Sequence, residues 1–145
     1  MAKASLVRPK KATNDLKIVM VPTDTLRASE YNPRIWDDTA AEKLRESIRR
    51  FGFVDPLIAN SAKGRERVLV GGHFRLQCAK DLGITEVPVV FLYITDIKRE
   101  RELNLRLNKN SGSFDMDLLK AFDIDMLLDV GFDDTDLTAL WGDSL

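Results

Sequence analysis

Two adjacent glycines, Gly71 and Gly72, separate a β-type run from an amphipathic helix, and this junction constrains the fold more than any other feature of the sequence. The run Arg67-Val68-Leu69-Val70 precedes them, and residues 73–82 follow with apolar side chains at helical spacing. A glycine pair allows a tight strand-to-helix turn and a close approach of a ligand to the backbone. The N-terminus of the following helix offers unpaired N–H groups and positive dipole charge. The sequence therefore predicts a strand–turn–helix unit, with either plain turn geometry or an anion site at the turn.

Three side chains near this turn suit the binding of an anion or the transfer of a proton. Arg75 lies one turn into the helix, and its guanidinium fits phosphate or carboxylate in a bidentate contact. His73 is the only histidine of the chain and is a candidate general base or ligand contact, or simply a surface residue at a helix start. Asp55 precedes Pro56 and is a candidate ligand neighbour, with a turn or capping role as the alternative.

Strand-type and helix-type patterns alternate along the first hundred residues. Residues 17–22 and 87–92 are apolar runs of strand length, and residues 53–70 contain two strand-type runs around a turn, which predicts a hairpin. Residues 39–51 form an amphipathic helix with a capping box from Thr39 to Glu42. This order predicts an α+β fold, with a small mixed β-sheet flanked by helices.

A charge-rich helix is predicted over residues 96–108. Its candidate core contacts are the apolar side chains of Ile97, Leu103 and Leu107. Three other side chains fall near one another at helical spacing and form a polar stripe, which either faces water or belongs to a site. They are Arg101, Asn104 and Asn108.

Charge is distributed very unevenly along the chain. The formal net charge is −1, but residues 111–145 hold nine Asp and one Lys, so this segment carries −8 and the remainder +7. A basic body suggests an anionic partner such as nucleic acid or a nucleotide, and contacts to a DNA backbone are expected to be salt-sensitive. The expected DNA contacts lie in a flexible basic arm over residues 1–16 and are Lys3, Arg8, Lys10 and Lys11.

The acidic segment is expected to form two helices, over residues 115–128 and 133–141, separated by a break at Gly131. This acidic helical extension either covers the basic body, connects to a partner, or keeps the protein soluble.

The cysteine count and the hydropathy pattern indicate where in the cell the protein is expected. Cys78 is the only cysteine, so the chain forms no internal disulfide, and one cysteine with one histidine does not make a structural zinc site. No apolar run approaches the roughly 20 residues that span a bilayer. We expect a cytoplasmic protein without a membrane partner and without a bound structural metal.

Five motifs in order carry a resemblance to a known family. They are Val21-Pro22, Tyr31-Asn32-Pro33-Arg34, Gly52-Phe53-Val54-Asp55-Pro56-Leu57, Val70-Gly71-Gly72-His73-Phe74-Arg75-Leu76 and Glu86-Val87-Pro88-Val89. Together they resemble the ParB/sulfiredoxin-like domain, also called the ParB-like nuclease domain, over residues 17–112. The following Leu105-Arg106-Leu107-Asn108-Lys109 and the acidic helices are most similar to the branch of phages and mobile elements, which often accompanies DNA methyltransferases.

The resemblance implies a nucleoside triphosphate at the glycine turn. Plasmid-partition relatives carry a glycine–acid–arginine–arginine signature there, which Gly72 and Arg75 match, while His73 and Phe74 replace the acid and the first arginine. The resemblance brings Arg34 to the same phosphates. It also places Asn108 on the later helix, where relatives carry a carboxylate for the metal as well. Because an oxygen ligand for Mg²⁺ is missing at that place, the resemblance argues against metal-dependent hydrolysis.

Sulfiredoxins carry a reactive cysteine in the equivalent turn, where this chain has His73. Cys78 lies deeper in the helix and is expected to be a small buried apolar residue.

Three functions remain open from the sequence. The first is a ParB-like module of a mobile element that associates with a nucleotide or nucleic acid and binds phosphate through Gly71, Gly72, His73 and Arg75, assisted by Arg34 and Asn108. The second is an enzyme: a nuclease, or a nucleoside triphosphatase or small-molecule kinase, with Mg²⁺ and with His73 and Asp55 as candidate catalytic groups. The third is an adaptor whose acidic extension, residues 113–145, docks a DNA methyltransferase or another DNA-processing partner.

Overall fold

A four-stranded mixed sheet forms the centre of the protein, in a computed structural model that describes residues 16–32, 35–109 and 114–142. The strands are β1 (Ile18–Pro22), β2 (Leu57–Asn60), β3 (Leu69–Gly71) and β4 (Glu86–Leu92), in the order β1-β4-β2-β3. β4 pairs antiparallel with β1 and parallel with β2, and β2 pairs antiparallel with β3. The predicted α+β class, the mixed sheet and the hairpin are confirmed.

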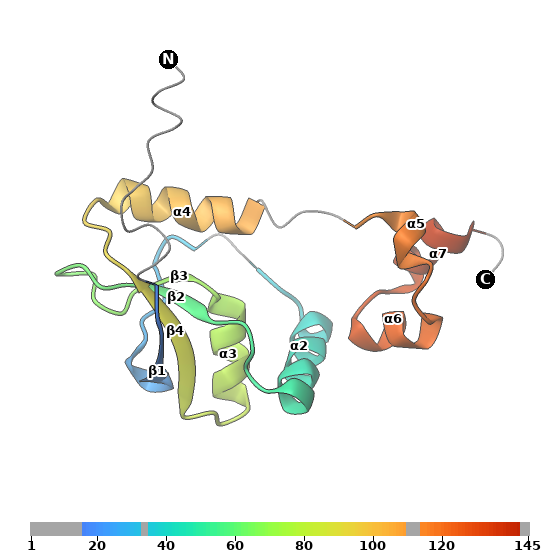
Figure 1. The fold of residues 1–145 in the computed structure, drawn as a ribbon, viewed down its shortest axis with the longest axis horizontal. Helices are drawn as coiled ribbons and strands as arrows, with labels where there is room; N and C mark the ends of the chain where they lie inside the picture. Colours follow the sequence, from blue (N-terminus) through green and yellow to red (C-terminus); the bar gives the residue numbers. More distant parts are fainter. Residues whose placement is uncertain (1–15, 33–34, 110–113, 143–145) are drawn as a thin grey trace, which may run out of the picture.

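Helices flank this sheet on the side of its buried apolar face and along one edge. A short 3₁₀ turn (η1, Thr23–Thr25) follows β1, and the helices are α2 (Asp38–Phe51), α3 (His73–Asp81) and α4 (Ile97–Lys109). Figure 1 shows α3 beside the sheet with α2 next to it, and α4 running past the β3 edge. The extension contains α5 (Met116–Leu119), α6 (Ile124–Val130) and α7 (Asp134–Trp141), which lie beyond α2 (Figure 1).

The main core lies between the sheet and α3. Leu57, Val87 and Val89 from the strands are fully buried against Leu76 and Ala79 from α3. Cys78 is also fully buried and belongs to the cluster between α3 and α2, as predicted for a small apolar residue.

The extension packs around its own small cluster, formed by Leu119, Leu127, Leu137 and Leu140. One helix was expected over residues 115–128, but the chain breaks after Leu119 and α6 starts at Ile124. Leu119 of α5 and Leu127 of α6 both belong to this cluster, so the two short helices pack on each other across the break. The division of the chain at residues 16 and 112 stays a prediction.

The start of α2 differs from the predicted capping box at Thr39. The N-cap is Asp37, whose Oδ1 accepts from the N–H of Ala40 at 2.7 Å. A carboxylate two residues earlier satisfies the free N–H groups and complements the positive end of the helix dipole. The predicted end at Gly52 is confirmed, with φ of +81° at that glycine.

The contacts of α4 differ from the prediction at two of its three core candidates, while the third, Leu103, is half-buried. Ile97 and Leu107, expected in the core, are 38% and 40% exposed, whereas Glu100 and Asn104 are buried. The polar stripe therefore turns inward at Asn104 rather than facing water, because these polar groups find partners in the sheet and in the loop before α2.

A buried carboxylate holds α4 in place. Arg65, in the connection between β2 and β3, contacts both oxygens of Glu100, with Nη2 at 2.6 Å from Oε2 and Nε at 3.2 Å from Oε1. The Tyr31 hydroxyl donates to Oε2 at 2.5 Å, and Asn60 Nδ2 donates to Oε1 at 2.7 Å. Burial raises the pKa of Glu100, but hydrogen bonds from these three residues outweigh it and hold that pKa below its usual value.

None of the described helices is long and apolar enough to cross a membrane.

The Arg65–Glu100 pair generates the first prediction. Arg65→Ala leaves the Glu100 carboxylate buried without its cation, so we expect the free energy of unfolding to fall by about 3–5 kcal/mol. Urea titration followed by circular dichroism measures this change.

Arg106→Ala is the matched control on the same helix. Arg106 pairs with Glu102 at 2.8 Å, but both side chains are more than half exposed, so its removal should cost no more than about 0.5 kcal/mol. Equal losses from the two substitutions would contradict the assignment of Glu100 as the anchor of α4.

Candidate functional site

The glycine turn joins β3 to α3 and is closely packed. Gly72 has φ of +99° and is the N-cap of α3. A Cβ at this position would lie 2.4 Å from Leu57 Cδ2, and a Cβ on Gly71 would lie 3.0 Å from Leu107 Cδ1. Gly72 is therefore required by its backbone conformation and packing, whether or not a ligand approaches it, whereas a side chain at Gly71 would displace the end of the Leu107 side chain.

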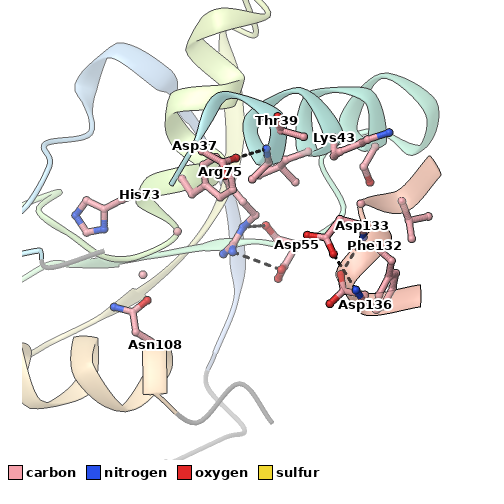
Figure 2. A pocket seen from close by; sticks show the side chains of 18 of the residues that line it. Asp37, Thr39, Lys43, Asp55, His73, Arg75, Asn108, Phe132, Asp133 and Asp136 are labelled. Atoms are coloured by element: carbon pink, nitrogen blue, oxygen red, sulfur yellow. Dashed lines mark hydrogen bonds and ion pairs between the residues drawn. The ribbon is translucent and has the colours of Figure 1, made fainter. Parts of the chain in front are cut away.

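A cleft of about 790 Å³ opens at this turn, a size that suits a small-molecule ligand. Gly71, Gly72 and the first turn of α3 form one wall, together with Asn104 and Asn108 of α4. The first turn of α2 and its following residues form a second side, and the extension forms a third (Figure 2). The N–H groups at the start of α3 have no acceptor within the helix, so this end of the cleft favours an anion.

His73 ties the turn to the segment that follows η1. Its Nε2 accepts a hydrogen bond from the N–H of Ser29 at 3.1 Å and lies 2.9 Å from Ser29 Oγ. A backbone N–H only donates, so Nε2 must be unprotonated and Nδ1 carries the ring proton. Burial lowers the pKa of His73, and the start of a helix disfavours a positive charge as well. His73 therefore lines the cleft and also holds the segment around Ser29 in position.

Arg75 and Asp55 lie together in the cleft. The Arg75 guanidinium donates to the carbonyl oxygens of Asp55 at 3.2 Å and Pro56 at 2.9 Å, and Nη1 lies 3.5 Å from Asp55 Oδ2. These contacts fix the loop that enters β2, and Figure 2 shows the guanidinium and the carboxylate facing one another. The cation expected to bind an anion therefore already has internal partners.

Three asparagines form a polar strip beside the turn. Asn104 is buried and donates to the Val70 carbonyl at 2.9 Å and to Asn32 Oδ1 at 3.3 Å. Asn108 lies one turn further along α4, and Nδ2 is 3.5 Å from Asn104 Oδ1. All three asparagines line the cleft, which places the predicted Asn108 near the glycine turn.

Five predicted site residues lie outside the described part of the chain. They are Arg34, expected at the phosphates, and Lys3, Arg8, Lys10 and Lys11, expected on DNA. Their roles stay predictions.

Sequence reasoning missed Lys43 and the contribution of the extension. Lys43 of α2 lines the cleft beside the extension, and no ion pair joins it to another described residue, whereas Arg45, Arg49 and Arg50 of the same helix are all paired. No local pattern in the sequence distinguished Lys43 from the other cations of this helix. The extension residues Phe114 and Phe132 gave no signal either, because their role depends on how the extension folds back.

Within the described residues, no group of three or more His, Cys, Asp or Glu side chains is arranged to hold a metal ion.

The His73–Ser29 contact generates a prediction about pH. A lowered pKa means that the unfolded chain takes up a proton near pH 6.5 while the folded chain does not, so this contribution to stability is complete above about pH 6.5 and is lost as pH falls through the lowered folded pKa. We expect the free energy of unfolding to decrease from pH 7 toward pH 5, measured by urea titration.

His73→Gln is the control, because its side-chain oxygen still accepts from Ser29 but does not titrate, and His73 is the only histidine. The decrease between pH 7 and pH 5 should be smaller in this variant. Identical slopes in both proteins would contradict a neutral, bonded His73.

Comparison with known proteins gives a consistent result. The sequence matches the ParB N-terminal domain family over residues 8–111. The ParB-like nuclease domain-containing protein YnaK of Escherichia coli K12 is 33% identical over 59% of this chain and 95% of its own length. Protein ORF326b of Acidianus two-tailed virus is 33% identical over 63% of this chain, which spans only 24% of the viral protein.

The fold also matches a solved structure. Chromosome-partitioning protein ParB from Caulobacter crescentus, truncated at its C-terminus and in complex with CTP-γ-S, has a TM-score of 0.65 at 20% identity. The match covers 86% of this chain and 70% of that one, and at this identity it shows a common fold. The motif order, the mixed sheet with its glycine turn and the match over residues 8–111 lead to one conclusion: this chain belongs to the ParB N-terminal domain family.

Proposed function

We propose that this chain is a nucleotide-binding module that holds the phosphates of a nucleoside triphosphate at the glycine turn, with CTP as the first candidate. The observation that carries the proposal is the 790 Å³ cleft at the N-terminus of α3, in a chain of this family. The related Caulobacter protein has CTP-γ-S bound, which supports a triphosphate as the ligand.

The expected roles follow from the geometry of the cleft. Backbone N–H groups at the start of α3 donate to phosphate oxygens, and the Asn108 amide is an additional donor. Lys43 supplies a positive charge that no described residue neutralises. Arg75 of α3 adds to the positive potential of the cleft, with its guanidinium held by the carbonyl oxygens of Asp55 and Pro56.

The contacts favour binding over catalysis. His73 uses Nε2 to accept from Ser29, and the Asp55 carboxylate lies against Arg75, so both candidate catalytic groups have positioning contacts. The nuclease, nucleoside triphosphatase and kinase alternatives would need one of these groups to exchange its partner for the substrate. Asp55 lines the cleft and would offer a carboxylate oxygen to a Mg²⁺ ion that accompanies the triphosphate.

One observation favours an additional adaptor role for the extension. Leu118 of α5, Phe122 of the connection after it and Met126 of α6 are 69%, 52% and 52% exposed in a segment that is rich in acidic side chains. Exposed apolar side chains with an acidic surround suit a partner with a basic, amphipathic segment. A DNA methyltransferase or another DNA-processing protein of a phage or plasmid is the proposed partner, and the viral relative supports an origin in a mobile element.

Contact with DNA is proposed for the basic part of the chain. Residues 1–110 carry a net charge of +7, obtained from −1 for the whole chain and −8 for residues 111–145. Such a contact would address the phosphate backbone and carry no sequence preference.

Titration calorimetry tests the nucleotide site. CTP with Mg²⁺ should bind the wild-type chain, and Lys43→Ala should weaken binding by roughly 10- to 100-fold, because a charge-assisted contact of about 1.5–3 kcal/mol is lost. Arg75→Ala should weaken binding as well, and ATP, GTP and UTP in the same assay define the preference for the base.

Lys98→Ala is the control, since Lys98 is an exposed lysine at the start of α4 outside the cleft. Absence of binding by all four nucleotides, or equal affinities of Lys43→Ala and Lys98→Ala, would overturn the proposed arrangement.

Salt titration tests the DNA contact. The logarithm of the affinity for a duplex should fall linearly with the logarithm of the salt concentration, and replacing Lys3, Arg8, Lys10 and Lys11 with Ala should make the slope shallower by roughly 3–4 units. Fluorescence anisotropy measures both. Replacing the three lysines with Arg keeps the charge and should keep the slope, and an unchanged slope in the Ala variant would exclude this arm from the interface.

A further inference from the structure

The cleft at the glycine turn has a wall that lies outside the region matched by the family. Residues 8–111 match the family, but Phe114, Gly131 and Phe132 of the extension also line the cleft. Figure 2 shows Phe132 across the cleft from His73 and Asn108. The ligand site therefore includes groups that the family match does not account for.

Two contacts to α2 hold this wall in position. Arg50 Nη1 lies 2.6 Å from Asp129 Oδ2 at the end of α6. Gly131 follows two residues later and packs on the Lys43 stem, since a Cβ at this glycine would lie 3.7 Å from Lys43 Cγ. The chain therefore places the extension beside the same helix that carries Lys43.

An aromatic pair forms the ligand-facing part of the wall. The rings of Phe114 and Phe132 lie edge to face, with centroids 5.3 Å apart and planes at 64°. Phe132 is half-buried and packs against the leucine cluster of the extension, so its ring is fixed. Phe114 is 65% exposed and still lines the cleft, so much of its ring is open to a ligand.

The extension wall carries negative charge, which disfavours the phosphates of a ligand at this end of the cleft. Its ionisable residues at the cleft are Asp133 and Asp136, which cap α7 through each other's backbone N–H at 2.9 Å. Carboxylates repel phosphate, whereas the start of α3 attracts it. A ligand with one anionic end and one flat, apolar end is therefore oriented with its phosphates at Gly72.

Phe74, which also lines the cleft, already has an aromatic partner outside it. Phe74 of α3 stacks on Trp36 with centroids 4.7 Å apart and planes at 27°. Phe74 also packs against the cluster of Ala41, Ile48 and Cys78, so little of its ring remains for a base.

From these observations we propose that the Phe114–Phe132 pair is the base-binding platform of the nucleotide site, and that the extension thereby completes the pocket. The inference rests on the proposed nucleotide function. Bases stack on aromatic side chains with little regard to their identity, so the platform adds affinity for the nucleoside part of the ligand.

The experiment compares Phe114→Ala with Phe122→Ala in the full chain. Both residues are exposed phenylalanines of the extension, but Phe122 does not line the cleft. Titration calorimetry with CTP and, separately, with inorganic triphosphate measures the two ends of the ligand. Phe114→Ala should weaken CTP binding on the order of tenfold and leave the triphosphate affinity unchanged, whereas Phe122→Ala should change neither. Phe114→Tyr keeps the ring and should keep the affinity for CTP.

The outcomes separate this inference from the proposed function. Equal CTP affinities of Phe114→Ala and Phe122→Ala, with CTP still bound by the wild type, would overturn the platform and leave the phosphate site standing. A parallel loss of CTP and triphosphate affinity in Phe114→Ala would also overturn it, because the ring would then act on the shape of the cleft and not on the base. Failure of both probes to bind the wild type would reject the nucleotide site itself.

Discussion

The burial of the Glu100 carboxylate determines how α4 and the glycine turn lie relative to one another. A charge without solvent is unfavourable unless several donors surround it, and Arg65, Tyr31 and Asn60 supply those donors. These partners come from three separate segments, so a single carboxylate joins the β2–β3 connection, the segment before α2 and the sheet. This polar contact fixes α4 at the β3 edge, where Leu107 also packs against Gly71.

The contacts of Glu100 position α4, and α4 in turn positions part of the cleft wall. One turn after Glu100, Asn104 reaches the Val70 carbonyl at the end of β3, and Asn108 follows at the rim of the cleft. Tyr31, held by Glu100, precedes Asn32, which also lines the cleft. His73 fixes the same segment from the other side through Ser29. The turn and the neighbouring loop are therefore arranged before any ligand arrives, which reduces the ordering cost of binding.

Local patterns in the sequence were sufficient to predict the strands, the hairpin, the glycine turn and the C-terminal ends of α2 and α3, since each depends on neighbours within a few residues. They failed for α4, where Ile97 and Leu107 suggested a buried face and Glu100 and Asn104 form it. Pairing of Glu100 with residues 35 and 69 positions away has no periodicity that a helical pattern can detect. The same limit applies to Arg75, which was predicted as an anion contact and has partners in the Asp55–Pro56 loop.

The acidic extension shows how charge alone gives an incomplete prediction. Its net charge suggested a segment that covers the basic body, connects to a partner or keeps the protein soluble, and none of these alternatives places aromatic side chains at the cleft. In the folded extension, Asp133 and Asp136 cap α7, and Asp129 pairs with Arg50. The rings of Phe114 and Phe132 line the cleft. An acidic wall is compatible with an anionic ligand provided that it meets the uncharged end. In the proposed nucleotide site, the carboxylates of the extension and the N-terminus of α3 would orient a ligand in the cleft by their opposite charge.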